Sequence, residues 1–439
     1  MLRTLDWRGQ RLDSAEVQSR IPRAAIGGAD VEEQVSRLVD EVRSRGVAAL
    51  QEQSQRFDEA APASIAEAPL TEAEVDEVLS PSLKEAITEA IRRVRQASQA
   101  QVPGEQVVDI APGAEIIQRW LPVERAGVYV PGGKAVYPSS VVMNVVAAQA
   151  AGVESIALAS PAQKDFDGHV HPVIRATASL LGVTEVYAMG GAGAIAALAY
   201  GVEEVGLRPV SVITGPGNRY VAAAKRLVKG TVGIDSEAGP TEIVVIADDS
   251  APADLVAADV VSQAEHDELA QAVVITTSAA LATEITNRID NRVQSTPHQE
   301  RVRESLTGEQ SAVILVDSLD DAVTVSDLLA PEHLEVMTVD ADVWARKTRH
   351  AGAVFIGEYT PVSAGDYLAG SNHVLPTGGK ATFQAGLSAM TFLRPQQLVR
   401  YSSEALSAIG PMVEVFAEAE DLPAHAEAVR ARTSPRKDG

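Results

Sequence analysis

The sequence predicts an α/β protein made of two doubly wound, incomplete Rossmann-like lobes with parallel-type sheets and with helical segments at both ends. Three observations support this. Short β-rich runs alternate with Ala-rich helical runs after Val123, and the alternation resumes after a break at residues 233–240. The first hundred residues and those after Arg394 instead repeat apolar residues at helical spacing. Alternation of this βαβ kind implies parallel sheets covered on both faces.

Each expected element has its own local pattern. Residues 30–57 and 70–101 repeat apolar side chains every three or four positions and predict helices. Apolar, β-branched runs predict the strands, which we expect at 127–130, 155–160, 185–189 and 210–215, and then at 242–248, 272–277, 312–316 and 353–357.

The length of 439 residues predicts at least two domains. The expected parts are an N-terminal arm (1–25), a first α/β lobe (26–104 and 242–387), a connecting segment (105–127), a second α/β lobe (128–241) and a C-terminal helical tail (388–439).

Composition narrows the class of function. With 60 acidic and 37 basic residues the net charge is -23, which opposes binding to nucleic acid or to an anionic membrane surface and favours a small-molecule partner. The absence of cysteine excludes disulfides, cysteine-ligated zinc, iron–sulfur clusters and a thiol nucleophile. The N-terminus has no apolar signal-peptide region, and no apolar run reaches the length of a membrane span, so we expect a cytoplasmic protein.

A glycine-rich turn follows the strand expected at 185–189. Residues 191–196 read G-x-G-x-x-A at the start of a helix, a pattern that lets a pyrophosphate approach a helix N-terminus. The next strand runs into Gly215-Pro216-Gly217-Asn218 rather than ending in the acidic residue that binds a ribose. The local pattern therefore leaves dinucleotide binding open.

Four histidines are not expected to take part in catalysis or metal binding. His169 and His171 have the spacing of metal ligands but lie in a polar loop, and we expect them at the surface. His298 and His350 also lie in polar surroundings, and we interpret them as solvated.

Gln263, His266, Asp366 and His373 are stronger candidates. Gln263 and His266 lie at positions i and i+3 near a helix end, where a histidine is either a metal ligand or a favourable helix terminus. Asp366 and His373 occupy a long Gly/Ser-rich loop after a strand, which is either a functional loop or a flexible connector.

The run APEHLEV (330–336) also has two interpretations. Pro331 suits a first helical position, and Glu332 and Glu335 suit the positive end of a helix. A histidine at such a helix N-terminus has a lowered pKa, so His333 would be neutral and able to accept a proton near neutral pH. Local sequence allows both a structural helix start and an acid/base pair.

Taken together, the runs GVYVPGGKAVYPSSVVMN, ITGPGN, GPTE, SQAEHD, APEHLE and GDYLAGSNHVLPTGG resemble those of the L-histidinol dehydrogenase family. The resemblance extends over essentially the whole chain. It implies oxidation of histidinol to histidinal and then to histidine, with two NAD+ consumed per turnover, as the final step of histidine biosynthesis. It also implies a homodimer with one zinc ion in each active site.

The resemblance assigns residues to the metal and to catalysis. Its zinc ligands are Gln263, His266, Asp366 and His425, of which His425 comes from the neighbouring subunit. His333 takes the hydroxyl proton as hydride leaves, and Glu332 activates water to attack the aldehyde. Because the chain has no cysteine, the second oxidation cannot pass through a thiohemiacetal and must pass through a hydrate.

The resemblance also implies contacts to the substrate and to NAD+. The substrate-binding positions are Thr241, Gln263, His266, His333, Asp366, His373, Glu420 and His425. Tyr129 and Asn218 match cofactor positions, while Gly193 stands where the family usually has glutamine, so one amide contact is lost. We therefore interpret the G-x-G-x-x-A pattern as coincidental, and Thr241 as keeping the hydroxyl that many relatives supply with serine.

Three alternatives remain. A related zinc- and NAD-dependent dehydrogenase could oxidise another polar alcohol such as a sulfonated diol, although Glu420 and His425 suit the amine and imidazole of histidinol. A zinc hydrolase would use Glu332 to activate water without a cofactor. A two-lobed binding protein would bind its ligand without turnover and would leave the ordered motifs unexplained.

Overall fold

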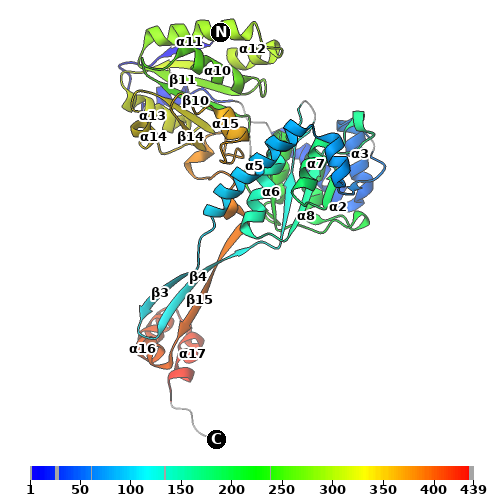
Figure 1. Ribbon diagram of the computed structural model, residues 1–439. Coiled ribbons are helices and arrows are strands. Elements are labelled where there is room, and N and C mark those ends of the chain that lie inside the picture. The colour runs from blue at the N-terminus through cyan, green and yellow to red at the C-terminus, as the bar shows by residue number, and fades with distance from the viewer. Residues whose placement is uncertain (1, 25–28, 61, 133–134, 238, 435–439) are drawn as a thin grey trace. The chain divides into compact units, whose positions relative to one another are not determined.

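The computed structural model describes residues 2–24, 29–60, 62–132, 135–237 and 239–434, and the chain forms two compact units. The first unit comprises Met1–Gln101 and Glu124–Phe392, and the second comprises Val102–Val123 and Leu393–Gly439. Figure 1 labels many of the elements of both units. The predicted α/β class, with two lobes of largely parallel sheet, is confirmed.

The first α/β lobe contains a parallel sheet in the order β1-β12-β11-β10-β13-β14. Its strands are β1 (Arg3–Asp6), β10 (Glu242–Ala247), β11 (Gln271–Thr276), β12 (Ala312–Leu315), β13 (His333–Met337) and β14 (Ala353–Ile356). The four central strands are almost wholly buried, as expected for a parallel sheet covered on both faces. β10 lies between β11 and β13, with Ile243 opposite both Ala272 and His333.

Helices cover both faces of this sheet, and each face has its own apolar core. The helices are α1 (Ala15–Ser19), α10 (Ala253–Ala264), α11 (Ala279–Val293), α12 (Gln299–Thr307), α13 (Leu319–Leu329), α14 (Ala341–Ala345) and α15 (Val362–Tyr367). Ser278 and Ser318 start α11 and α13 by accepting backbone N–H hydrogen bonds, which satisfies donors that the first turn of a helix leaves free.

The helical interpretation of APEHLEV is wrong, because these residues enter strand β13. Ala330 closes α13 in the left-handed conformation, and Glu332 then leads directly into the strand. Leu334 and Val336 pack into the core on one face, while Met337 packs on the other. Pairing with β10 and β14 outweighs the local helix-start signal, since an acidic residue after proline suits either environment.

The second α/β lobe has a sheet in the order β2-β7-β6-β5-β8-β9, parallel except for β2. Its strands are β2 (Ala66–Glu67), β5 (Arg125–Tyr129), β6 (Ser155–Ser160), β7 (Glu185–Ala188), β8 (Val212–Thr214) and β9 (Gly233–Ile234). Its helices are α6 (Pro138–Ala151), η1 (Lys164–Phe166), α7 (Pro172–Leu180), α8 (Gly191–Tyr200), η2 (Glu203–Val205) and α9 (Arg219–Val228). Helices α6 and α8 are apolar on nearly every side because neighbouring helices and the sheet enclose them.

The helices predicted at 30–57 and 70–101 are present in the described residues, but they pack mainly on the second lobe, whereas residues 26–104 were expected to belong to the first. These helices are α2 (Ala29–Arg45), α3 (Val47–Phe57), α4 (Glu72–Val78) and α5 (Pro81–Ala100). Helices α2 and α3 contact α8, and α5 contacts α6 (Figure 1). Strand β2 pairs with β7. The N-terminal arm instead supplies β1, the edge strand beside β12. An amphipathic pattern shows that a helix has a buried face but not which lobe covers it.

The second unit differs from the expected connecting segment and wholly helical tail. It contains an antiparallel sheet in the order β15-β4-β3, with β3 (Gln106–Ala111), β4 (Ala114–Pro122) and β15 (Leu393–Tyr401), followed by α16 (Ser403–Ala419) and α17 (Pro423–Thr433). β15 pairs with β4 from Leu393 opposite Pro122 to Tyr401 opposite Ala114. Such pairing between distant segments leaves no local periodic signal that reveals it.

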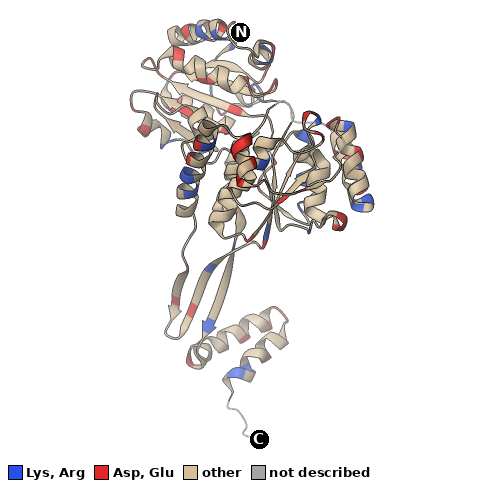
Figure 2. Cartoon of the chain, turned by 45° about the vertical axis from the view of Figure 1, so that its right-hand side comes forward, with Lys and Arg blue, Asp and Glu red and all other residues tan. Residues whose placement is uncertain are grey.

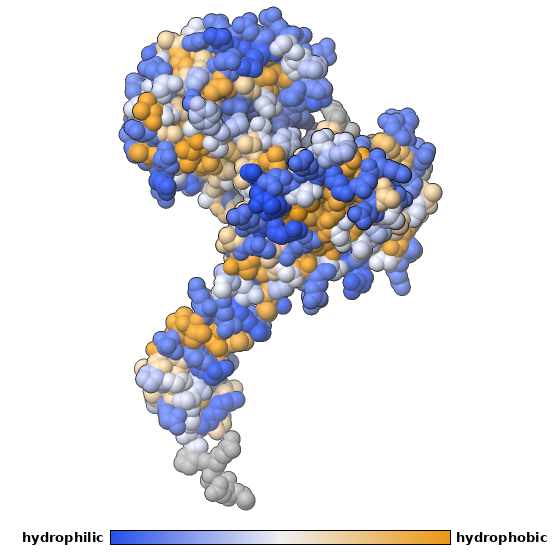
Figure 3. All heavy atoms as spheres, in the orientation of Figure 1, coloured by the Kyte–Doolittle hydropathy of each residue, from blue (hydrophilic) through white to orange (hydrophobic). Residues whose placement is uncertain are grey.

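The surfaces of the two units differ in character. Figure 2 shows acidic and basic residues interspersed along the outer helices, with few charges on the central strands. On the second unit, apolar side chains reach the surface, as Figure 3 also shows; they include Val107, Ile110, Met412, Val415 and Phe416.

Within the described residues, every helix is too short or too polar to cross a membrane. Two short 3-10 helices, η3 (Lys380–Thr382) and η4 (Ala389–Phe392), complete the first unit.

Candidate active site

Most of the predicted site residues meet at the amino-terminal edge of the first-lobe sheet. Glu242 begins β10 and His333 begins the neighbouring strand β13, and Thr241 and Glu332 immediately precede these two strands. Parallel pairing places these two strand starts side by side. The position is unusual for a doubly wound sheet, whose ligands generally bind at the carboxyl ends of the strands.

Glu332 is buried, and two donors hold one of its carboxylate oxygens. Its Oε2 accepts hydrogen bonds from the Thr241 hydroxyl at 2.5 Å and from the Glu242 backbone N–H at 3.0 Å. Burial raises the pKa of Glu332 to about 8, opposed by these two hydrogen bonds and reinforced by the negative charge of Asp366. The carboxylate is therefore a stronger base than an ordinary glutamate.

His333 has one committed and one free ring nitrogen. Its Nδ1 lies 2.9 Å from the Glu242 carbonyl oxygen, so Nδ1 carries the proton and donates. The other nitrogen, Nε2, is buried and has no hydrogen-bond partner among the described residues. Burial lowers the pKa of His333, which keeps the ring neutral. The predicted lowering thus has burial in a strand as its cause, not a helix N-terminus.

Gln263 and His266 arrive from the end of α10. The Gln263 side-chain amide donates to the Thr241 hydroxyl, which extends the hydrogen-bonded chain to Glu332. His266 follows the C-cap of the helix, and desolvation lowers its pKa while the charge of Asp366 opposes that shift. Both side chains therefore face the same cluster as Glu332 and His333.

Asp366 and His373 complete the cluster in the first unit. Asp366 lies on the short helix α15 and not in an open loop, and the preceding Gly365 packs so closely on Phe355 that a Cβ there would lie 2.5 Å from the ring. His373 Nδ1 donates to the Asp366 carbonyl at 2.9 Å, and its Nε2 lies 3.3 Å from the Ser140 hydroxyl of α6. His373 therefore joins this edge of the first lobe to the second lobe.

Sequence reasoning missed Glu242 as a site residue, although it named the GPTE run that contains it. Its Oε1 accepts from the Gly378 N–H at 2.8 Å, and its Oε2 accepts from the Glu332 N–H at 3.3 Å. Burial raises the pKa of Glu242 to about 7, with the Gly378 hydrogen bond opposing and the Glu332 charge reinforcing the shift. The detectable signal was a carboxylate at the start of an otherwise apolar strand.

The predicted zinc ligands of the first unit suit zinc chemically. Among the described residues, no group of three or more His, Cys, Asp or Glu side chains is arranged to hold a metal ion. Within this unit the predicted set contains only two such side chains, His266 and Asp366. Gln263 donates a hydrogen bond through Nε2, so its amide oxygen Oε1 remains available as an acceptor or a metal ligand. No described residue donates a hydrogen bond to this oxygen. An amide oxygen, a neutral imidazole and a carboxylate are donors that zinc accepts.

The two other predicted site residues, Glu420 and His425, belong to the second unit. Glu420 is the C-cap of α16 and His425 lies in the first turn of α17, and both side chains are exposed. They are therefore not among the side chains that the first unit gathers at β10 and β13, and their contribution to a site stays a prediction.

The predicted cofactor positions lie in the second lobe, at the carboxyl ends of β5 and β8. The strand order reverses between these two strands, which is where doubly wound sheets bind nucleotides. The Tyr129 hydroxyl accepts from the Gly191 N–H at 3.2 Å, and burial raises the pKa of Tyr129 to about 12. Asn218 caps α9, accepting from the Tyr220 and Val221 N–H groups at 3.0 and 3.2 Å.

Gly193 is buried inside α8 against α3. A Cβ at this position would lie 2.4 Å from Oε1 of Gln53 and 3.2 Å from the Leu50 side chain. The amide of Gln53 itself donates to the Leu38 carbonyl at 3.1 Å. The glycine therefore allows close packing of α3 on α8, which accounts for its presence without a pyrophosphate.

The four remaining histidines have local partners or face solvent. His169 Nδ1 lies 3.2 Å from the Glu67 carboxylate, and His171 caps α7 by accepting from the Val173 N–H at 3.2 Å. His298 is exposed, and His350 is half-buried. The expected exposure is therefore found for His169 and His298, whereas His171 and His350 are half-buried.

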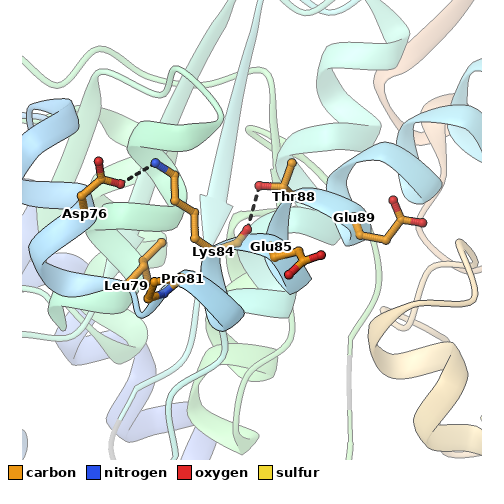
Figure 4. A pocket seen from close by; sticks show the side chains of 7 residues that line it. All are labelled: Asp76, Leu79, Pro81, Lys84, Glu85, Thr88 and Glu89. Atoms are coloured by element: carbon orange, nitrogen blue, oxygen red, sulfur yellow. Dashed lines mark hydrogen bonds and ion pairs between the residues drawn. The ribbon is translucent and has the colours of Figure 1, made fainter.

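A separate surface hollow lies between α4 and α5, away from the cluster. Figure 4 shows its lining of Asp76, Leu79, Pro81, Lys84, Glu85, Thr88 and Glu89. Its volume is 690 Å³, but its lysine forms an ion pair with Asp76 at 2.5 Å. None of the predicted site residues lines this hollow.

Comparison with known proteins gives one family. The family model described as histidinol dehydrogenase matches residues 21–433. A histidinol dehydrogenase from Leifsonia xyli subsp. xyli is 55% identical over 99% of this chain and 100% of its own length. One from Thermobifida fusca is 51% identical over 99% and 98% of the two chains. The crystal structure of histidinol dehydrogenase from Elizabethkingia anophelis superposes with a TM-score of 0.90 at 31% identity, covering 98% of each chain.

Proposed function

Because the chain belongs to the histidinol dehydrogenase family, we propose that it oxidises L-histidinol through L-histidinal to L-histidine with zinc and two NAD+. The chain is accordingly an oxidoreductase of histidine biosynthesis. The observation that carries the proposal for the chemistry is the pair formed by a neutral His333, with a free buried Nε2, and the buried base Glu332.

In the first oxidation, His333 is the general base. Its Nε2 accepts the proton of the substrate hydroxyl. At the same time, a hydrogen on the carbinol carbon leaves with its bonding electrons as hydride. The Nδ1 hydrogen bond to the Glu242 carbonyl fixes the ring and supports the charge that develops on it. NAD+, when bound, supplies the two-electron acceptor for each oxidation.

The second oxidation needs a base for water. Glu332 takes a proton from water as the water oxygen adds to the aldehyde carbon. His333, protonated in the first oxidation, returns its proton to the former carbonyl oxygen, which completes the hydrate and leaves His333 neutral again. His333 then takes a hydroxyl proton of the hydrate as the second hydride leaves. The sum is one alcohol, one water and two NAD+ giving one carboxylate, two NADH and three protons. This route uses no thiol, in agreement with a chain that lacks cysteine.

The metal would bind at the edge that Gln263, His266 and Asp366 share. The resemblance adds the partner's His425 as the fourth ligand. Zinc, when bound, supplies a Lewis-acid template that fixes the polar groups of the substrate. Thr241, His373 and Glu420 are the proposed further substrate contacts, and Tyr129 and Asn218 the proposed NAD+ contacts.

We further propose a homodimer with shared sites. The second unit supports this, because it carries the exposed His425 together with an apolar surface formed by β3 and α16. Exposed apolar patches of this kind usually belong to surfaces that bind another protein chain.

The first test counts NADH against substrate. Purified protein is supplied with zinc and NAD+ and with limiting L-histidinol, and NADH and histidine are measured at completion. Two NADH and one histidine per histidinol are expected. One NADH with release of aldehyde would contradict the role of Glu332, and no NADH would contradict histidinol as the substrate.

A second test concerns the shared site. His333→Ala and His425→Ala variants should each be inactive alone, and subunit exchange between them is expected to restore about one working site per mixed dimer. Lack of rescue, with mixed dimers confirmed by mass spectrometry, would place His425 in its own subunit's site or outside the site.

A further inference from the structure

Two carboxyl groups close to the candidate site, the buried Glu335 and the half-buried Asp259, have no role in the proposed reaction. Glu335 follows His333 by two positions on β13, so both side chains leave the same face of the strand. Its side chain is 1% exposed. Asp259 comes from α10, one turn before Gln263, and its carboxyl group is hydrogen-bonded to Glu335.

This contact requires a proton. Glu335 Oε1 accepts the Val362 N–H at 3.0 Å, whereas Oε2 is buried with no N–H or O–H donor among the described residues. Two carboxylates cannot hydrogen-bond to each other unless one is protonated. If both groups were ionised, two like charges would lie together in desolvated surroundings.

The charges around the pair act on its two members differently. Arg292 of α11 acts on Asp259 and favours its ionised form, while Arg292 itself is bonded to the exposed Asp254 at 2.7 Å. Burial raises the pKa of Asp259 to about 6 and raises that of Glu335 well above its usual range. The buried Oε2 of Glu335, which has no other donor, and the raised pKa of both groups agree with one proton shared by the pair.

The pair connects three elements that carry the candidate site. β13 carries His333, α10 carries Gln263, and α15, which begins at Val362, carries Asp366. One side chain of β13 thus bonds both the backbone of α15 and a side chain of α10. α10 and α15 also pack against each other directly.

We propose that Glu335 and Asp259 are positioning residues, which share one proton and thereby hold α10 and α15 at the correct distance from His333. The effect on the reaction rests on the proposed function, whereas the shared proton does not. Loss of the proton would place two negative charges next to each other, between β13 and α10. The repulsion would weaken the packing of α10, which carries Gln263, and of α15, which carries Asp366, on β13.

The sign of the pH dependence follows from the raised pKa values. The folded protein binds this proton more tightly than the unfolded chain, so the stabilisation is present at low pH and is lost as pH rises through the folded-state pKa. Other groups near the pair are Arg292, Asp254 and His333. Because His333 also titrates during catalysis, the urea unfolding midpoint is the primary readout and activity the second.

Glu335→Gln tests the shared proton. Glutamine keeps an oxygen for the Val362 N–H and gains a permanent N–H donor for Asp259, so it preserves both bonds without a titratable proton. Between about pH 7 and about pH 10, the wild-type midpoint is expected to fall further than that of the variant. An equal fall in the two proteins would overturn the shared proton.

Glu335→Leu and Asp254→Asn complete the experiment. Leucine removes both bonds and is expected to lower kcat/KM for L-histidinol by roughly tenfold or more, while Glu335→Gln stays within about threefold of wild type near pH 7. Asp254→Asn is the control. Asp254 lies on α10, as Asp259 does, but is exposed and pairs with Arg292, so the kcat/KM of this variant should match that of wild type. Full activity of Glu335→Leu would overturn the positioning role.

Failure of the proposed function gives a different result. If wild type and Asp254→Asn do not oxidise histidinol, the proposed function fails, and the midpoints still decide whether the proton is shared. If Glu335→Leu does not fold, the comparison of wild type with Glu335→Gln still tests the pair in both readouts.

Discussion

Removal of the Thr241 hydroxyl should lower the ionised fraction of Glu332, and with it the rate of the second oxidation, by a predictable amount. The hydroxyl is one of two donors to Glu332 Oε2, at 2.5 Å, and Thr241→Val removes it with little change of shape. The backbone N–H of Glu242 remains, at 3.0 Å. The substitution therefore changes one hydrogen bond to the carboxylate and leaves the other.

The magnitude follows from the strength of such bonds. A hydrogen bond to a charged group contributes about 1.5–3 kcal/mol, and one pKa unit corresponds to about 1.4 kcal/mol. Loss of a bond to the ionised form should therefore raise the pKa of Glu332 by about one to two units above its already raised value. Near neutral pH, the ionised fraction and hence the rate of water addition should fall by about 10- to 100-fold.

The assay uses L-histidinal and NAD+, which isolates the second oxidation, and records the rate as a function of pH. The rate of Thr241→Val should rise with pH over a range displaced to higher values and approach wild type at alkaline pH. Thr241→Ser keeps the hydroxyl and is the control. If the Thr241→Val and Thr241→Ser profiles superpose, the hydroxyl does not set the basicity of Glu332.

The remaining predictions concern the edge of the second lobe where the cofactor is proposed to bind. Lys225 is 1% exposed and bonds Asp235 at 2.6 Å, so Lys225→Met should lower the free energy of unfolding by about 3–5 kcal/mol in urea titration, with partial recovery in Lys225→Met/Asp235→Asn. If Lys225→Met lowers the free energy of unfolding only as much as the loss of an exposed ion pair does, this prediction is wrong. Gly215 has φ +120°, and a Cβ there would lie 1.9 Å from the Tyr129 carbonyl oxygen, so Gly215→Ala should cost at least about 1–3 kcal/mol and weaken NAD+ binding measured by calorimetry. Unchanged affinity would show that the 215–218 turn does not contact the cofactor.

Local sequence determined much of the α/β architecture. The apolar runs at 242–247 and 271–276 could be recognised as strands because a parallel strand buried on both faces must be apolar throughout its length. The lack of cysteine likewise excluded a thiol mechanism. The choice of Glu332, His333 and the metal ligands, however, came from resemblance to a family, since their local patterns allowed helix ends and loops equally well.

Tertiary structure alone decided the conformation and chemistry of the APEHLEV run. Pairing with β10 and β14 makes it a strand, and the Glu242 carbonyl selects the His333 tautomer that leaves Nε2 free. Only folding shows that Glu335 bonds Asp259 across 76 positions of sequence. The pairing of β15 with β4 and the packing of α2 on α8 are of the same kind. Local periodicity reports which side of an element is buried, whereas burial, tautomer and pKa depend on the groups that distant segments bring to that side.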